Sequence, residues 1–107
     1  MSASVWLRVA TLADLAAAEG KLGLAAGGHA IALYRLDSAV LATEDSCPLD
    51  RTRLTEGALD GARIVCPRRH VFDLATGELR IGAPGGATLR RYAVKVEEDA
   101  IFVCTEE

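Results

Sequence analysis

Short apolar runs separated by turn-forming residues recur along almost the whole chain, and this spacing restricts the fold more than any other feature of the sequence. Strands are predicted where the runs alternate or are rich in β-branched residues, at residues 5–9, 21–25, 30–36, 40–43, 63–66, 90–96 and 100–105. Gly27-Gly28 and Glu98-Asp99 stand at hairpin spacing, because glycine and short acidic residues tolerate the backbone angles of tight turns. Pro84-Gly85-Gly86 predicts another turn. The pattern is typical of a small all-β sandwich or barrel.

Two segments depart from the strand pattern. Residues 11–19 (TLADLAAAE) predict one short helix, with Thr11 as its N-cap. Residues 44–57 (EDSCPLDRTRLTEG) fit neither period. A structureless segment of this length is unusual in a small domain, so it indicates either a functional loop or strands that the pattern fails to reveal.

Length and charge limit the possible functions. The 107 residues suffice for one domain. A net charge of −3 and an aromatic content of 5% argue against a nucleic-acid surface. No apolar run is long enough to span a membrane, and the first ten residues lack a secretory signal. We therefore expect a cytoplasmic protein whose three cysteines are reduced or bind a metal.

Two loops begin with the same dipeptide, Cys47-Pro48 and Cys66-Pro67. Proline withdraws one backbone donor and fixes φ, so neighbouring N–H groups can point toward the sulfur. A structural zinc site needs four ligands. Cys47, Cys66 and His70 supply three, and a fourth would have to come from Asp50 or from distant Cys104.

The chain from residue 5 to 103 resembles the small Rieske-type ferredoxins and the related small subunit of assimilatory nitrite reductase. Four segments carry the resemblance: CPLDRTRLTEG at 47–57, RIVCP at 63–67, FDLATGE at 72–78 and RRYAVKVEEDAIFV at 90–103. The resemblance implies one antiparallel β-sandwich domain over residues 1–107, with a small cluster-binding subdomain built on loops 44–57 and 66–73. It also implies that Cys47 and Cys66 are the two thiolate ligands of a [2Fe-2S] cluster.

The family's two imidazole positions are changed in this chain. They hold Leu49, which has no lone pair, and Arg69, whose guanidinium stays protonated. A local change of register in the second loop would bring His70 into the second imidazole position. One iron would then still lack a ligand, which Asp50, a water or an outside ligand would have to supply.

Three interpretations follow, and none of them is an enzyme. The ligand count favours an accessory or small-subunit protein that has lost its cluster, in which Cys47 and Cys66 could form a disulfide. The alternative is an electron-transfer protein with a [2Fe-2S] cluster on Cys47, Cys66, His70 and a fourth ligand, serving a larger oxygenase or reductase. The third is a small zinc or redox-sensing thiol protein.

Arginines are concentrated in the two cysteine loops, at Arg51, Arg53, Arg68 and Arg69. They predict docking to a carboxylate-rich partner surface or to a phosphate group. The alternative is that they pair locally with Glu44, Asp45 or Asp50. Leu49 is expected to fold inward over the site, since burying a leucine is favourable by roughly 2 kcal/mol.

Overall fold

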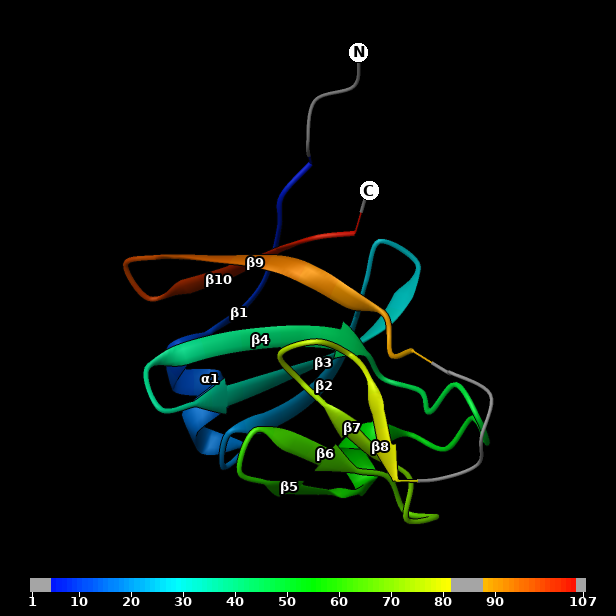
Figure 1. The fold of residues 1–107 in the computed structure, drawn as a ribbon. Helices are drawn as coiled ribbons and strands as arrows, with labels where there is room; N and C mark the ends of the chain where they lie inside the picture. Colours follow the sequence, from blue (N-terminus) through cyan, green and yellow to red (C-terminus); the bar gives the residue numbers. More distant parts are fainter. Residues whose placement is uncertain (1–4, 82–87, 106–107) are drawn as a thin grey trace.

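The computed structural model describes residues 5–81 and 88–105, so the turn predicted at 84–86 lies outside the described residues. The larger of two antiparallel sheets has six strands in the order β1-β10-β9-β4-β3-β2. Their bounds are β1 (Leu7–Thr11), β2 (Lys21–Ala26), β3 (His29–Leu36), β4 (Ala39–Glu44), β9 (Arg91–Glu97) and β10 (Ala100–Cys104). Figure 1 shows β9 and β10 above the hairpins formed by β2, β3 and β4. These strands confirm the all-β prediction.

A second sheet of four short strands lies beside one end of the large sheet (Figure 1). Its strands follow chain order: β5 (Ala58–Asp60), β6 (Arg63–Val65), β7 (Val71–Asp73) and β8 (Leu79–Ile81). Only β6 is predicted by the sequence pattern. All four strands have three residues each, which is too short for an alternating pattern, and β6 is predicted from its β-branched residues Ile64 and Val65.

The hairpin turns and the helix agree with the local sequence. Gly27 and Gly28 both have positive φ, +58° and +81°, between β2 and β3, as a two-residue hairpin loop requires. The helix α1 (Leu12–Ala17) is shorter than the predicted 11–19. Thr11 is its N-cap: the Thr11 hydroxyl accepts from the Asp14 N–H, and the Asp14 carboxylate accepts from the Thr11 N–H.

Strand β3 separates two hydrophobic cores. Ile31 and Leu33 face the core enclosed by the large sheet and α1, whereas Ala32 and Tyr34 face the core between the two sheets. All four side chains are fully buried, which explains the continuous apolar run in this part of the sequence. The second core also contains Cys47, Leu54, Ile64, Cys66, Phe72, Leu74 and Leu89. Both cysteines of the Cys-Pro loops are therefore anchored in a core.

Gly57 allows the segment before β5 to approach β6. A Cβ at this position would lie 1.9 Å from the Val65 carbonyl oxygen and 3.1 Å from the Cys66 Cα. Because real Cβ atoms never come this close to a carbonyl oxygen, only glycine fits here without moving the strand that leads into Cys66.

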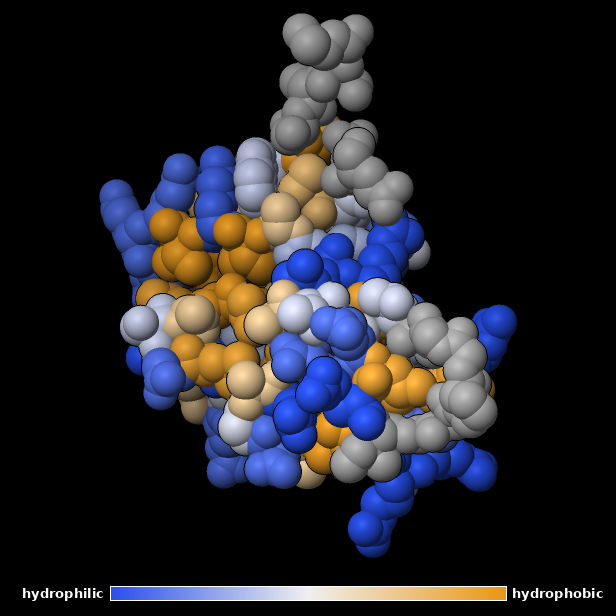
Figure 2. Space-filling model, viewed as in Figure 1, coloured by the Kyte–Doolittle hydropathy of each residue, from blue (hydrophilic) through white to orange (hydrophobic). Residues whose placement is uncertain are grey.

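Part of the outer surface is apolar. Figure 2 shows this surface where β9 passes over β4. Val40 and Val94 are half-buried there against the core of the large sheet, and Val96 is 41% exposed. Within the described ranges, no helix is long and apolar enough to cross a membrane.

Candidate metal centre

Two loops with matching hydrogen bonds form one end of the small sheet. In the first, the Cys47 N–H donates to the Thr52 carbonyl and the Arg51 N–H donates to the Cys47 carbonyl, each over 2.8 Å. In the second, the Cys66 N–H donates to the His70 carbonyl over 2.9 Å, and the Arg69 N–H donates to the Cys66 carbonyl over 2.8 Å. Both loops thus turn tightly around the cysteine that begins them.

Each loop contains one arginine in the left-handed region, Arg51 with φ 65° and Arg69 with φ 73°. Non-glycine residues rarely adopt this conformation. His70 follows Arg69, and its Nδ1 lies 3.5 Å from Cys66 Sγ, whereas Arg69 is exposed. This arrangement is compatible with the change of register considered from the sequence, which stays a prediction.

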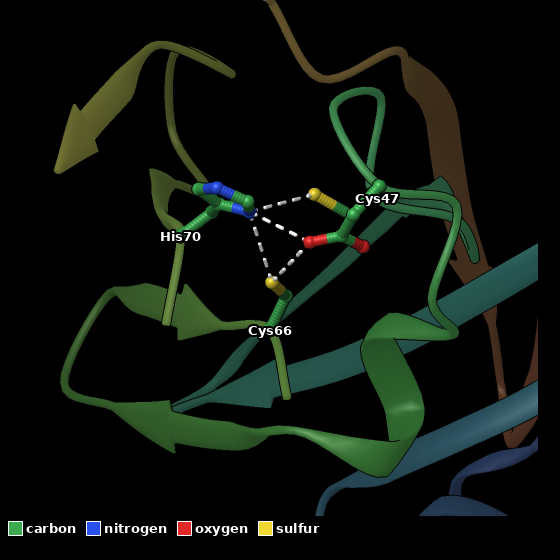
Figure 3. A group of neighbouring side chains, drawn as sticks. Cys47, Cys66 and His70 are labelled. Atoms are coloured by element: carbon green, nitrogen blue, oxygen red, sulfur yellow. Dashed lines mark hydrogen bonds and ion pairs between the residues drawn. The ribbon is translucent and has the colours of Figure 1, made fainter. Parts of the chain in front are cut away.

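Four potential ligand atoms converge between the loops (Figure 3). They are the Sγ atoms of Cys47 and Cys66, the Nδ1 of His70 and a carboxylate oxygen of Asp50, and all lie within 4.8 Å of one another. His70 Nδ1 is 3.6 Å from Cys47 Sγ, 3.5 Å from Cys66 Sγ and 2.7 Å from Asp50 Oδ2. The sulfurs are buried, whereas the histidine and aspartate side chains keep 20% and 13% of their surface exposed.

The structure shows which of the candidate fourth ligands lies near Cys47, Cys66 and His70. Asp50 joins the group, and Cys104, buried at the end of β10, does not. Arg69 is exposed. Leu49 is half-buried against the core below the loops, as expected. Cys47 and Cys66 are both free thiols, so the disulfide is not formed in this structure.

Burial and hydrogen bonding shift the pKa values of two of the four candidate ligands, Cys47 and Asp50, in opposite directions. Burial raises the pKa of the Cys47 thiol to about 11, although the N–H groups of Leu49 and Asp50 oppose the shift. Burial also disfavours ionisation of Asp50, but hydrogen bonds from Thr52, Cys66 and His70 outweigh it and hold the pKa of this carboxyl below its usual range. At neutral pH the site therefore offers a carboxylate, together with a Cys47 thiol that would lose its proton to a binding metal.

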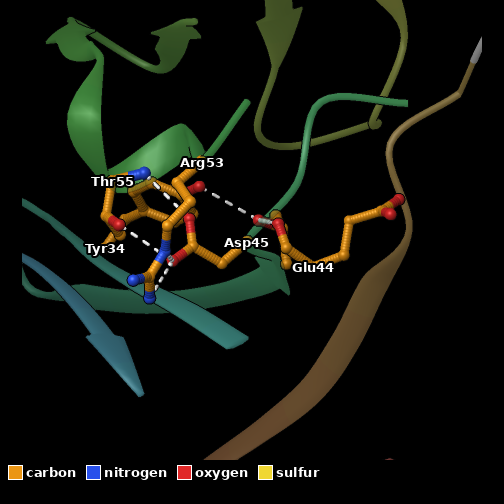
Figure 4. Close-up of polar contacts among 6 residues, drawn as sticks. Tyr34, Glu44, Asp45, Arg53 and Thr55 are labelled. Carbon is orange, nitrogen blue, oxygen red and sulfur yellow. Dashed lines mark hydrogen bonds and ion pairs between the residues drawn. The ribbon is translucent and has the colours of Figure 1, made fainter. Parts of the chain in front are cut away.

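A buried carboxylate, Asp45, holds the start of the first loop (Figure 4). Its Oδ1 accepts from the Thr55 N–H over 2.8 Å, and its Oδ2 accepts from the Thr55 hydroxyl over 2.8 Å and from Arg53 over 3.2 Å. A Cβ on Gly23 would lie 2.8 Å from Oδ2, so β2 is close to this network. Arg53 is thus paired locally, as the alternative interpretation of the arginines predicted.

The other three arginines of the loops, Arg51, Arg68 and Arg69, have exposed side chains. Arg69 and Pro67 line an open hollow of about 510 Å³ beside Cys66, together with Glu56, Gly57, Ala58, Asp60 and Val65. The surface next to the site therefore has a shallow depression lined by side chains of both charges, with exposed arginines around it.

Thr52 was not predicted from the sequence to take part in the site. Its N–H donates to Asp50 Oδ1 over 2.8 Å, and its hydroxyl donates to the same oxygen. An aspartate that binds the backbone two residues later forms an Asx turn, for which Asp-x-Thr is a recognisable signal.

Comparison with known proteins gives a consistent result. The sequence matches the family described as a Rieske-like [2Fe-2S] domain over residues 5–104. It is 31% identical over 100 residues to the ferredoxin component of the naphthalene 1,2-dioxygenase system of Pseudomonas putida, covering 92% of this chain and 93% of that protein. It is also 31% identical over 104 residues to the ferredoxin CarAc of Metapseudomonas resinovorans, covering 96% of each chain.

Solved structures agree with the sequence matches. The ferredoxin of carbazole 1,9a-dioxygenase from Nocardioides aromaticivorans IC177 superposes with a TM-score of 0.85 at 26% identity, covering 96% of this chain and 100% of that one. A structure titled as a putative nitrite reductase small subunit shares the fold, with a TM-score of 0.75 at 20% identity over 92% of this chain and 97% of that chain. On the family match and these identities, the chain belongs to the Rieske-like [2Fe-2S] domain family.

Proposed function

We propose that this protein is a one-electron carrier that holds a [2Fe-2S] cluster on its two cysteine loops and serves a larger oxygenase. The observation that carries the proposal is the convergence of two thiols, an imidazole and a carboxylate within 4.8 Å. The family and the ferredoxin relatives support it. Of the two main interpretations of the sequence, this is the electron-transfer alternative and not the cluster-free protein.

The donor set fits the cluster chemically. Cys47 and Cys66 provide the two thiolates that one iron requires, and His70 Nδ1 provides one imidazole nitrogen for the other iron. When bound, such a cluster accepts and releases one electron. The protein's own contribution is to bury the sulfurs, to keep His70 partly exposed near the surface, and to keep competing polar side chains such as Arg69 outside.

Metal analysis tests the proposal directly. Protein purified without oxygen is expected to be red-brown and to contain about two irons and two acid-labile sulfides per chain. The measurements are the visible spectrum and iron and sulfide assays. Colourless protein without iron and sulfide, obtained from cells with active cluster assembly, contradicts the proposal.

Two of the distances in the site fit a second candidate, a single zinc ion, whereas the 2.7 Å between His70 Nδ1 and Asp50 Oδ2 is a hydrogen bond and shorter than the spacing of two zinc ligands. With zinc–sulfur bonds of about 2.3 Å and zinc–nitrogen bonds of about 2.0 Å, tetrahedral ligands stand roughly 3.3–3.8 Å apart. The two sulfur–nitrogen distances of 3.6 and 3.5 Å fall in this range. One zinc per chain without sulfide in the same assays would establish this candidate in place of the first.

The partner is proposed to be an oxygenase component. One similar solved chain, with a TM-score of 0.83 at 30% identity over 98% of this chain and 97% of that one, comes from a complex of reduced oxygenase and oxidized ferredoxin in carbazole 1,9a-dioxygenase. Here Arg68 and Arg69 stand exposed in the loop that carries Cys66 and His70. A carboxylate-rich partner surface that binds these arginines would bring the partner's electron acceptor close to the site.

We also propose a cytoplasmic location, which reduced cysteines fit.

Docking can be tested on the arginines. Replacing Arg68 and Arg69 together by alanine is expected to weaken binding about fivefold at low salt, because exposed charges contribute chiefly to encounter. The probe is the purified oxygenase component of a naphthalene 1,2-dioxygenase system, and the measurements are affinity and the rate of oxygenase reduction at several salt concentrations. Arg8→Ala with Arg35→Ala removes the same charge from exposed positions on β1 and β3 and serves as the control. Equal weakening by both pairs would exclude the loop surface as the docking site.

A further inference from the structure

The resemblance implies that one iron lacks its second imidazole, and Asp50 lies beside the other candidate ligands. Its Oδ2 is 2.7 Å from His70 Nδ1 and 3.3 Å from Cys66 Sγ. Leu49, which the resemblance places at an imidazole position of the family, packs on the core instead. No other histidine, cysteine or acidic residue of the described ranges joins this group.

We propose that Asp50 is the fourth protein ligand of the cluster, so that one iron is held by His70 and a carboxylate in place of two imidazoles. This inference rests on the proposed function. Carboxylate oxygen is an established ligand for iron in proteins. One ligand can be replaced by another without loss of the fold, because the hydrogen bonds within the two loops hold the backbone in place.

Thr52 orients the carboxylate for this role. Its N–H and its hydroxyl both donate to Oδ1, so that oxygen is occupied within the loop. Oδ2 is the oxygen that faces His70 and Cys66. The Asx turn therefore presents one oxygen to the site, and Thr52 acts as a positioning residue.

The proposed ligand changes the charge of the site. Two thiolates and two neutral imidazoles leave an oxidised [2Fe-2S] centre neutral, whereas a carboxylate in place of one imidazole adds one negative charge. Negative charge near the cluster disfavours the added electron and lowers the reduction potential. The carrier would therefore be a stronger reductant than a relative with two imidazoles.

The test uses three variants of the intact protein. Asp50→Asn keeps the acceptor for Thr52 but loses the anionic ligand, and it is expected to retain at least threefold less iron than the wild type after gel filtration. Asp50→His supplies an imidazole, and it is expected to retain the cluster with a raised reduction potential and a changed electron paramagnetic resonance spectrum. Asp73→Asn is the matched control, because Asp73 Oδ1 also accepts the N–H of the residue two positions later, over 2.8 Å, outside the site.

Thr52→Val and Thr52→Ser test the positioning role. Valine is expected to shift the reduction potential while iron remains bound, and serine, which keeps the hydroxyl, to restore the wild-type value. Circular dichroism checks that each variant is folded.

The outcomes separate the two proposals. Wild-type protein without iron and sulfide overturns the proposed function itself. Wild-type protein with a cluster, together with an Asp50→Asn variant of unchanged iron content, spectrum and potential, overturns only the role of Asp50.

Discussion

Asp45→Ala is expected to lower the free energy of unfolding by about 3 kcal/mol, because it removes a buried carboxylate that accepts several hydrogen bonds and leaves a cavity in its place. The side chain of Asp45 is fully buried. Its two oxygens accept both the N–H and the hydroxyl of Thr55 in addition to Arg53. For a domain of this size the loss corresponds to a fall of roughly 10–15 °C in the unfolding midpoint.

The effect should extend to the metal centre. Asp45 and the 3-10 turn η1 (Leu54–Glu56) enclose the loop that carries Cys47 and Asp50. Thermal and urea unfolding measure the stability, and iron content measures the consequence for the site. Asp99→Ala, at an exposed turn, is the control and should change the midpoint by no more than a degree or two. A midpoint for Asp45→Ala equal to that of Asp99→Ala contradicts the structural role.

Replacing either loop cysteine by alanine is expected to remove nearly all bound iron, at least tenfold relative to the wild type, because each sulfur would supply one of only two thiolates. Cys47→Ala and Cys66→Ala are chosen over serine because a hydroxyl in these buried positions adds a desolvation cost. The measurements are iron and sulfide per chain and the visible spectrum, with circular dichroism to confirm folding.

The chain offers its own control for this experiment. Cys104 is also buried, but it lies at the end of β10 and outside the ligand group. Cys104→Ala is therefore expected to keep the full iron content. If all three alanine variants lost iron equally, the loss would reflect general destabilisation and the assigned thiolate pair would be wrong.

Local sequence was sufficient for the large sheet and its turns. Alternating and β-branched runs are recognisable because side chains along a strand repeat every two residues. Gly27 and Gly28 can adopt a positive φ because glycine has no side chain. Thr11 caps α1 through contacts within three residues. These features depend on neighbours along the chain, so a single sequence reveals them.

The strand pattern of the sequence did not predict most of the small sheet. Strands β5, β7 and β8 have three residues each, and they are held by pairing with β6 and by burial of Phe72 and Leu74 in the second core. Their stability comes from tertiary packing, which a periodicity argument does not detect.

The pattern of residues was enough to predict a small all-β protein, and four motifs carried its resemblance to the Rieske-type ferredoxins. Residue chemistry also excludes the side chains of Leu49 and Arg69 as ligands wherever the chain places them. Which residues lie beside Cys47 and Cys66 became known from the arrangement of the two loops in space. Arg69 has a positive φ and His70, the next residue, lies against Cys66, while the Asx turn from Asp50 to Thr52 leaves the other oxygen of Asp50 facing His70. These choices depend on backbone angles and on contacts between two loops distant in sequence, and residue type alone does not specify either.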